Sequence, residues 1–218
     1  MIKIQQYDFF IFDCDGVILD SNSLKNDAFR SVLKNEDPIL IDSFINYHKQ
    51  NGGVSRYEKF YHFYKNMKQS KKVKEDVSYA LERFSSIVKK ELSDTKYVPG
   101  VINFIKEIDK NTKNIYIVSG SDQAELISVF KNRNIRHFFK KIFGSPTEKM
   151  KNTFLVLKDN PKQKKGIFFG DSKLDFQCAK YYKMDFIFVK RFSEWEDYSN
   201  YQNKFLCSID DFSKLQYA

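Results

Sequence analysis

The sequence predicts an α/β protein: a mainly parallel sheet with helices on both faces, and an all-helical segment inserted after the first strand. Short apolar runs at 7–12, 114–118, 166–169 and 186–189 are typical of strands buried on both faces, and stretches with helical spacing separate them. Between about 21 and 96 the spacing is amphipathic and helical, with no convincing strand. Strands that alternate with helices indicate parallel pairing, and the strand-free stretch indicates the insert.

The chain is expected to leave the α/β core near residue 20 and to re-enter it near residue 97. The core would then comprise residues 1–20 and 97–218, and the helical segment residues 21–96. The insert contains four amphipathic stretches, which are LKNDAFRSVL, ILIDSFINYH, RYEKFYHFYKNM and VSYALERFSSIVKKEL. The core helices have readable starts, at Pro99-Gly100, at Ser119-Gly120-Ser121-Asp122 and at Ser172, since Ser and Asp accept hydrogen bonds from the first helical amides.

The composition excludes several classes of protein. The chain has 218 residues, of which 42% are apolar and 30% charged, so it can bury a core and is not disordered. No apolar run is long enough to cross a bilayer and the N-terminal segment lacks a signal-peptide pattern, so we expect a cytoplasmic protein without a membrane partner. The formal charge of +9 would attract anions, but the bases are scattered and form no nucleic-acid-binding motif.

Cysteines and histidines do not form a recognisable metal or disulfide pattern. Cys14, Cys178 and Cys207 are odd in number and widely spaced, which argues against a disulfide framework or a zinc site. His48, His62 and His137 lack paired metal-ligand spacing and are expected at the surface or half-buried.

Acidic residues follow two of the predicted strands directly. Asp13 and Asp15 come after the run at 7–12, and Asp171 and Asp175 come after the run at 166–169. Ligands bind beyond the carboxyl ends of the strands in an open parallel sheet, so these carboxylates should share one edge. Paired carboxylates repel unless they share a cation or proton, and such oxygen ligands suit Mg²⁺. A lone pair such as Asp13 and Asp15 would fit an acidic turn equally well.

Two further loops at this edge offer phosphate-binding chemistry. Ser119 and Gly120 follow the run at 114–118, with a hydroxyl and the amides of an expected helix N-terminus. Lys149 follows a loop and could neutralise a phosphoryl oxygen, with Lys151 as the nearby alternative. A nucleophile, a metal-binding carboxylate and donors to the phosphoryl oxygens are the parts that phosphoryl transfer needs.

In the order and spacing of four motifs the sequence resembles the haloacid dehalogenase superfamily, specifically phosphatases and phosphomutases with a helical cap after the first strand. The motifs are FDCDGV (12–17), VSGS (118–121), GSPTEK (144–149) and GDSKLD (170–175), and the resemblance spans essentially the whole chain. It implies a Rossmann-like core with the helical segment as its cap. The branch that it resembles is that of phosphoglycolate phosphatase and β-phosphoglucomutase.

The resemblance assigns roles to the strand-end residues. It implies that Asp13 is the nucleophile that becomes an aspartyl phosphate, and that Asp15 protonates the leaving alcohol and then activates water. It implies a Mg²⁺ ion held by the Asp13 carboxylate, the Asp15 backbone carbonyl and Asp171. Ser119, with Gly120, and Lys149 would bind the transferring phosphoryl group, and Asp175 would support the metal waters or Lys149. Members that break carbon–halogen or carbon–phosphorus bonds lack an acid at the position of Asp15.

The expected cap carries two candidate substrate residues. GGVSR (52–56) resembles the cap loop of that branch, in which an arginine, here Arg56, can reach the substrate; the same letters also fit a plain turn that ends one helix and starts the next. Lys25 stands where β-phosphoglucomutases carry a histidine, a departure that argues against mutase activity.

The sequence therefore predicts a Mg²⁺-dependent phosphatase for a small phosphorylated metabolite such as a sugar phosphate, a phosphoglycolate-like compound or a glycan precursor. The alternatives are a phosphomutase, a nucleotide or nucleic-acid-end phosphatase or binding protein, and a catalytically silent binding module. The leaving group is open, and so is the choice between a monomer and a homodimer.

Overall fold

A parallel sheet of six strands forms the centre of the protein, in the computed structural model that describes residues 3–112, 114–161 and 165–215. The strand order is β3-β2-β1-β4-β5-β6, and all five pairings are parallel. The strands are β1 (Phe9–Phe12), β2 (Ile115–Asp122), β3 (Lys141–Ser145), β4 (Gly166–Gly170), β5 (Asp185–Val189) and β6 (Cys207–Ile209). The predicted fold class is confirmed.

Two of these strands were not predicted from the sequence. β3 and β6 are the edge strands, so each has only one neighbour and neither is buried on both faces. β3 begins at the exposed Lys141, and β6 has three residues, none of them buried. The continuous apolar run that identified the four inner strands is therefore missing from both edges.

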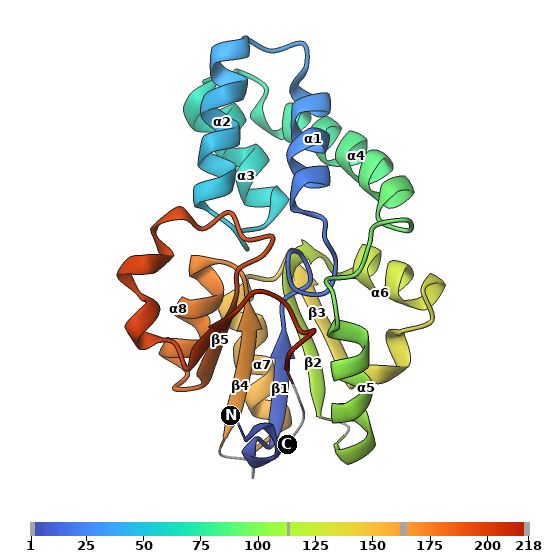
Figure 1. Ribbon diagram of the computed structural model, residues 1–218. Coiled ribbons are helices and arrows are strands. Elements are labelled where there is room, and N and C mark those ends of the chain that lie inside the picture. The colour runs from blue at the N-terminus through green and yellow to red at the C-terminus, as the bar shows by residue number, and fades with distance from the viewer. Residues whose placement is uncertain (1–2, 113, 162–164, 216–218) are drawn as a thin grey trace.

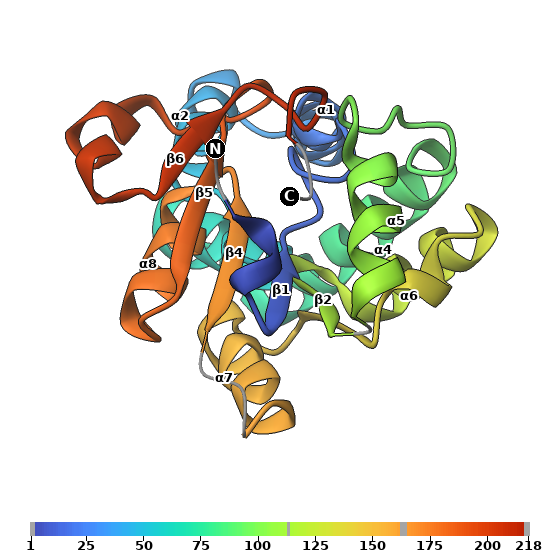
Figure 2. The same cartoon turned by 60° about the horizontal axis from the view of Figure 1, so that its bottom comes forward.

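Helices cover the sheet on both faces (Figure 2). The helices of the core are α5 (Val101–Asn111), α6 (Gln123–Asn132), α7 (Lys149–Asp159) and α8 (Lys173–Tyr181). Phe104 of α5 and Phe130 of α6 belong to the apolar cluster that contains Phe10 and Phe12 of β1. Residues of α7 and α8 belong instead to the cluster on the opposite face, which contains Phe9 and Ile11, since successive side chains of β1 point to opposite faces.

Two of the predicted helix starts are confirmed, but the amides expected at one of them are not helical. Ser172 caps α8 as predicted, in a reciprocal capping box with Asp175. The helix QAELISVFKN begins at Gln123 as predicted, and the Asp122 side chain caps it by accepting from the Glu125 amide. Ser119 and Gly120 do not belong to this helix N-terminus, however, because β2 continues to Asp122. The strand register shifts between Val118 and Asp122, so the amides at Ser119 and Gly120 belong to an irregular strand end.

Four helices and one π-helical segment form a separate layer over the carboxyl ends of the strands (Figure 1). They are α1 (Asn22–Leu33), α2 (Pro38–Gln50), α3 (Arg56–His62), the π-helical η2 (Phe63–Met67) and α4 (Val73–Glu91). Their shared interior is rich in aromatic residues: Phe29, Phe44 and Phe60 pack ring against ring, with Phe84 on one side. Aliphatic side chains such as Leu33 and Ile45 complete this interior.

The two connections between this layer and the sheet run next to each other. Leu19 bridges to Tyr97, and the Asp20 amide donates to the Lys96 carbonyl at 2.9 Å. The chain thus leaves and returns at one place, and we keep residues 21–96 as the proposed extent of the cap. In the described ranges no helix is both long enough and apolar enough to span a membrane.

Candidate active site

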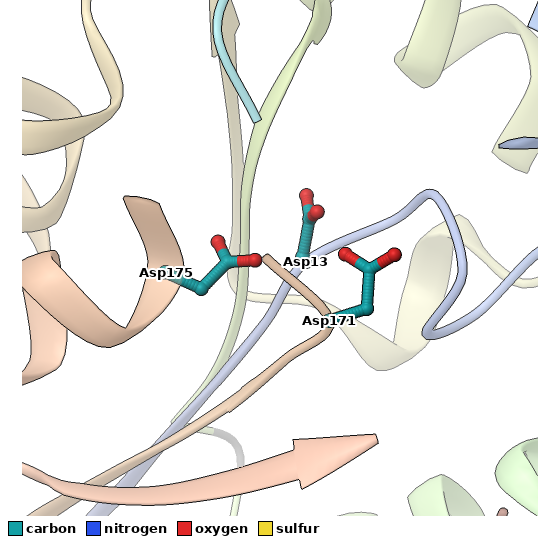
Figure 3. A group of neighbouring side chains, drawn as sticks. All are labelled: Asp13, Asp171 and Asp175. Carbon is teal, nitrogen blue, oxygen red and sulfur yellow. The ribbon is translucent and has the colours of Figure 1, made fainter. Parts of the chain in front are cut away.

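Three buried carboxylates meet at the carboxyl ends of β1 and β4. Phe12 and Phe169 are register partners in these neighbouring strands, so the residues that follow them, Asp13 and the Gly170-Asp171 pair, reach the same level. Asp175 joins them from the first turn of α8, and the three residues have oxygen atoms within 4.8 Å of one another (Figure 3). The sequence placed these acids at one edge of the sheet, and the structure brings them together there.

Glycine is required beside these acids. Gly16 has a φ of +72°, and a Cβ atom there would lie 2.2 Å from Asp171 Oδ2. Gly170 is as constrained, since its Cβ would lie 2.3 Å from that of Asp175. Only a residue without a side chain allows the two loops to approach closely enough for the carboxylates to meet.

Lys149 is buried among these carboxylates. Its Nζ donates to Asp175 Oδ1 at 2.6 Å and lies 3.1 Å from Asp13 Oδ1, an ion-pair distance without hydrogen-bond geometry. Burial alone would lower the pKa of Lys149, but Asp13 and Asp175 outweigh it and raise that pKa. Lys149 therefore stays an ammonium beside Asp13, which is the state in which a lysine can bind phosphoryl oxygens.

The carboxylates still carry more charge than Lys149 neutralises. Burial raises the pKa of Asp13 to about 7, and burial with the neighbouring acids raises the pKa of Asp171 well above its usual value. Asp13 Oδ1 is buried and accepts no hydrogen bond from any described residue. Excess buried negative charge and an unsatisfied oxygen are what a hard divalent cation would relieve, so this donor set fits Mg²⁺.

Asp175 differs from the other two acids because its oxygens are already engaged. Oδ1 accepts from Lys149, and Oδ2 accepts from the Ser172 amide at 3.1 Å and the Ser172 hydroxyl at 2.6 Å. It is fully buried. Its geometry suits the support of Lys149, one of the two roles that the sequence left open for it.

Asp15 has a different set of partners from Asp13. Its carboxylate accepts hydrogen bonds from Ser21 at 2.5 Å, from Ser121 at 2.7 Å and from Lys25 of α1, which also donates to Ser121. Burial would raise the pKa of Asp15, but Lys25 together with the two hydroxyls holds it below its usual value. Asp15 is therefore ionised and lies outside the cluster of Asp13, Asp171 and Asp175. In this state it can accept a proton, but it must gain one before it can donate.

Ser119 and Gly120 lie in the irregular last part of β2. Ser119 is fully buried and its hydroxyl accepts from the Ser121 amide at 3.1 Å. Gly120 touches the cap, because a Cβ atom there would lie 2.2 Å from the Gly53 carbonyl oxygen. A cap loop thus lies directly on the proposed phosphate loop.

Two polar contacts hold the cap on the core beside this loop. Arg56 is buried, and its Nη2 donates to Glu125 Oε2 of α6 at 2.9 Å. Tyr57 donates to Asp122 Oδ2 at 2.7 Å. Ser55 also caps α3, so GGVSR is a helix-to-helix turn that at the same time places Arg56 in the site.

These residues enclose a cavity between cap and core. Asp13, Asp15, Lys25, Arg56 and Gly120 all line it, whereas Lys149 and Ser119 lie behind its surface. The volume that the centre of a water molecule can occupy is about 70 Å³, against the 10–15 Å³ or so that one water needs. The closed site therefore accepts a small molecule.

Several lining residues were missed from the sequence, and one expectation was wrong. His48 is buried at the cavity rather than at the surface or half-buried, because α2 turns it inward against Phe29. Lys59, Glu125, Glu194 and Trp195 also line the cavity. Ser121 lies within the VSGS motif and could have been found there, but the others belong to helices or loops whose packing the sequence does not reveal.

Comparison with known proteins identifies the family of this chain. A family model described as haloacid dehalogenase-like hydrolase matches residues 10–189. No curated protein matches the sequence.

Solved structures share the fold across nearly the whole chain. A haloacid dehalogenase-like hydrolase from Streptococcus pneumoniae is 23% identical, with a TM-score of 0.69 over 95% of this chain and 96% of that one. A predicted phosphoglycolate phosphatase from Haemophilus somnus is 15% identical, with a TM-score of 0.74 over 96% of each chain. A β-phosphoglucomutase from Clostridium difficile is 20% identical, with a TM-score of 0.70 over 100% of this chain and 94% of that one.

Proposed function

The chain belongs to the haloacid dehalogenase-like hydrolase family, and on that premise we propose that it is a Mg²⁺-dependent phosphatase that hydrolyses a small phosphorylated metabolite. One observation carries this proposal above the others. A buried nucleophile candidate, Asp13, lies against a lysine and a second carboxylate, while another acid, Asp15, faces the cavity with separate partners. That division separates covalent chemistry from proton transfer.

In the proposed reaction the Asp13 carboxylate attacks phosphorus, and the bond from phosphorus to the leaving oxygen breaks. Lys149 and Ser119 hold the phosphoryl oxygens, and the ammonium of Lys149 offsets their charge. Mg²⁺, held by Asp13, Asp171 and the Asp15 backbone carbonyl, would supply further charge neutralisation at the same oxygens. Asp175 keeps Lys149 in place through its 2.6 Å hydrogen bond.

Water then attacks the aspartyl phosphate, and Asp15 accepts the proton from that water. Lys25 favours this step, because its contact with Asp15 keeps the carboxylate ionised and so able to act as a base. In the first step Asp15 would pass to the leaving alcohol a proton that it takes from the Lys25 ammonium in contact with it. In the second step the bond from phosphorus to Asp13 breaks, and Asp15 returns the proton of the attacking water to Lys25, so the cycle balances. β-Phosphoglucomutases carry a histidine where this chain has Lys25. The difference favours hydrolysis over transfer of the phosphoryl group back to the substrate, and we keep a phosphomutase as the alternative.

The size and closure of the cavity support a small metabolite over a nucleic-acid end. Gly53 of the cap lies against Gly120, and Arg56 and Tyr57 bind α6, so a polymer would have to open these contacts. The test is a screen of phosphorylated metabolites with Mg²⁺ and detection of inorganic phosphate. Release of phosphate from a small ester supports a phosphatase; isomerisation without release would identify a mutase, and turnover of oligonucleotide ends alone would contradict the proposal.

A further inference from the structure

Lys59 is a buried cation in the cap that the proposed phosphoryl chemistry does not use. It lies on α3, its side chain is 3% exposed, and it lines the same cavity as Asp13. Its Nζ lies 2.7 Å from His48 Nδ1 and donates to the His48 carbonyl oxygen at 3.3 Å. An ammonium has three N–H groups, so this arrangement leaves one free for the cavity.

No carboxylate in the described part of the chain forms an ion pair with Lys59. The other cavity cations have such partners: Lys25 with Asp15, Arg56 with Glu125, Lys49 with Glu194 and Lys173 with Asp197. An unpaired buried charge is costly, because no solvent replaces the water that it has lost. Burial accordingly lowers the pKa of Lys59 to about 7. An anionic group beside Lys59 would therefore stabilise its ammonium form.

His48 holds Lys59 without neutralising it. Burial, with Lys59 and Lys25 nearby, keeps the pKa of His48 well below its usual value, so the ring is neutral and accepts at Nδ1. The Phe29 ring, with its centroid 4.5 Å from that of His48, fixes the imidazole in turn. A carboxylate in the same position would have cancelled the lysine charge, whereas a neutral imidazole leaves that charge for a ligand.

Arg56 provides a second, independent observation at the same place. It precedes Lys59 by three residues on α3, so the two side chains share one face of the helix. Arg56 uses Nη2 for Glu125, but its Nε and Nη1 are buried without a hydrogen-bond partner among the described residues. Buried N–H groups normally have partners, so these donors also await an acceptor.

We infer that Lys59, positioned by His48 and assisted by the free N–H groups of Arg56, binds a second anionic group at the end of the substrate remote from the transferred phosphate. The inference rests on the proposed function and narrows its substrate class to phosphate esters that carry another carboxylate or phosphate. Both groups offer several acceptor oxygens and a negative charge, which are what this part of the cavity lacks.

The test compares three phosphate monoesters of equal chain length that end in a carboxylate, a second phosphate or a hydroxyl group. Phosphate release with Mg²⁺ gives kcat/KM for each ester. We expect at least one anionic ester to exceed the hydroxyl ester by about ten-fold or more, the effect typical of a hydrogen bond to a charged group. The preferred anion identifies the second group as carboxylate or phosphate.

Lys59→Met should reduce that preference by about ten-fold, and Lys59→Arg should retain most of it, because the guanidinium keeps the charge. Lys65→Met, at an exposed lysine just beyond α3, is the matched control and should keep the full preference. His48→Leu should lose part of the preference and His48→Gln should restore it, since the amide oxygen can accept from Lys59. The ratio is measured on one preparation, so partial misfolding does not affect it.

Equal kcat/KM values for the three esters in the wild type would overturn the inference, as would equal losses on all three in Lys59→Met. Either result leaves the proposed function standing, because the esters are still hydrolysed. If none of a broad set of phosphate esters releases phosphate above the level of Asp13→Asn, the proposed function itself fails.

Discussion

The two walls of the cavity are built in different ways. On the core wall and directly behind it, charged groups bind one another: Asp175 binds Lys149, and Lys149 lies against Asp13. On the cap wall, Nε and Nη1 of Arg56 have no acceptor, and Lys59 has no acidic partner, among the residues that the structure describes. The core is thus preorganised for one transferred group, whereas the cap is incomplete until a ligand binds. The difference indicates that chemistry and selectivity belong to separate parts of the molecule, and substitutions should separate them.

The largest effect should come from the nucleophile of the core wall. Asp13→Asn replaces the carboxylate by an amide of nearly equal volume that cannot act as an anionic nucleophile. We expect kcat to fall by about 10⁴-fold or more, as for other nucleophile substitutions, on every phosphate ester. Steady-state phosphate release measures the loss, and unchanged circular dichroism shows that the fold is kept. Activity within a few-fold of the wild type would refute the assignment.

The next effect distinguishes two acids of the core wall. Asp15→Asn should lower kcat by roughly 10² to 10⁴, the usual contribution of general acid–base catalysis, while the Mg²⁺ requirement stays near that of the wild type. Asp171→Asn should instead raise the Mg²⁺ concentration needed for half-maximal activity, because it removes a proposed ligand. Calorimetric titration of both variants with Mg²⁺ is the check. Equal weakening of Mg²⁺ binding in the two would show that the division of roles is wrong.

Most of the core wall could be predicted from the sequence, for a physical reason. Parallel strands present their carboxyl ends at one edge, so residues that directly follow strands, such as Asp13 and Asp171, meet whatever the rest of the chain does. The close approach that requires Gly16 was not predicted, because it is to Asp171 on another strand end. The edge strands β3 and β6 were not predicted. Each pairs with a single neighbour, and neither has the continuous apolar run by which the inner strands were recognised.

The cap wall could be predicted only in part. Helical periodicity shows which face of α3 is apolar, but not which residue of another element lies opposite it. Arg56 pairs with Glu125 from a position 69 residues away, and His48 meets Lys59 across the turn between α2 and α3. Such contacts depend on how the helices pack against each other, and the same apolar faces can pack in more than one geometry. The cap residues were therefore predicted by resemblance or missed.

A smaller and selective effect is expected at Arg56. Arg56→Ala removes a buried guanidinium that binds Glu125 and faces the cavity, so kcat/KM for the preferred substrate should fall by about 10- to 100-fold. A small generic phosphate ester that cannot reach the cap should lose only the smaller factor that comes from the lost contact between cap and core. Arg30→Ala, at an exposed arginine of α1, is the control and should change neither substrate. Equal losses on both esters would place Arg56 in cap folding or closure rather than in substrate selection.

The smallest effect should come from the hydrogen bond between Tyr57 and Asp122, which joins cap and core outside the cavity. Tyr57→Phe removes the hydroxyl that donates to Asp122 Oδ2 at 2.7 Å, while Asp122 Oδ1 still accepts from the Glu125 amide and keeps α6 capped. A hydrogen bond to a carboxylate that is only part-buried contributes about 1.5 kcal/mol, so the ratio of closed to open protein should fall by roughly ten-fold.

Because closure precedes transfer for every substrate, Tyr57→Phe should lower kcat/KM for the preferred and the generic ester by the same factor. This uniform loss is the opposite of the selective loss expected for Arg56→Ala, although the two residues are adjacent on α3. Tyr61→Phe, at a tyrosine 52% exposed one turn further along the helix, is the matched control and should equal the wild type. A loss confined to the preferred ester would mean that Tyr57 contributes to substrate selection rather than to cap closure. The residues of the cap that select the substrate would then include Tyr57 as well as Arg56.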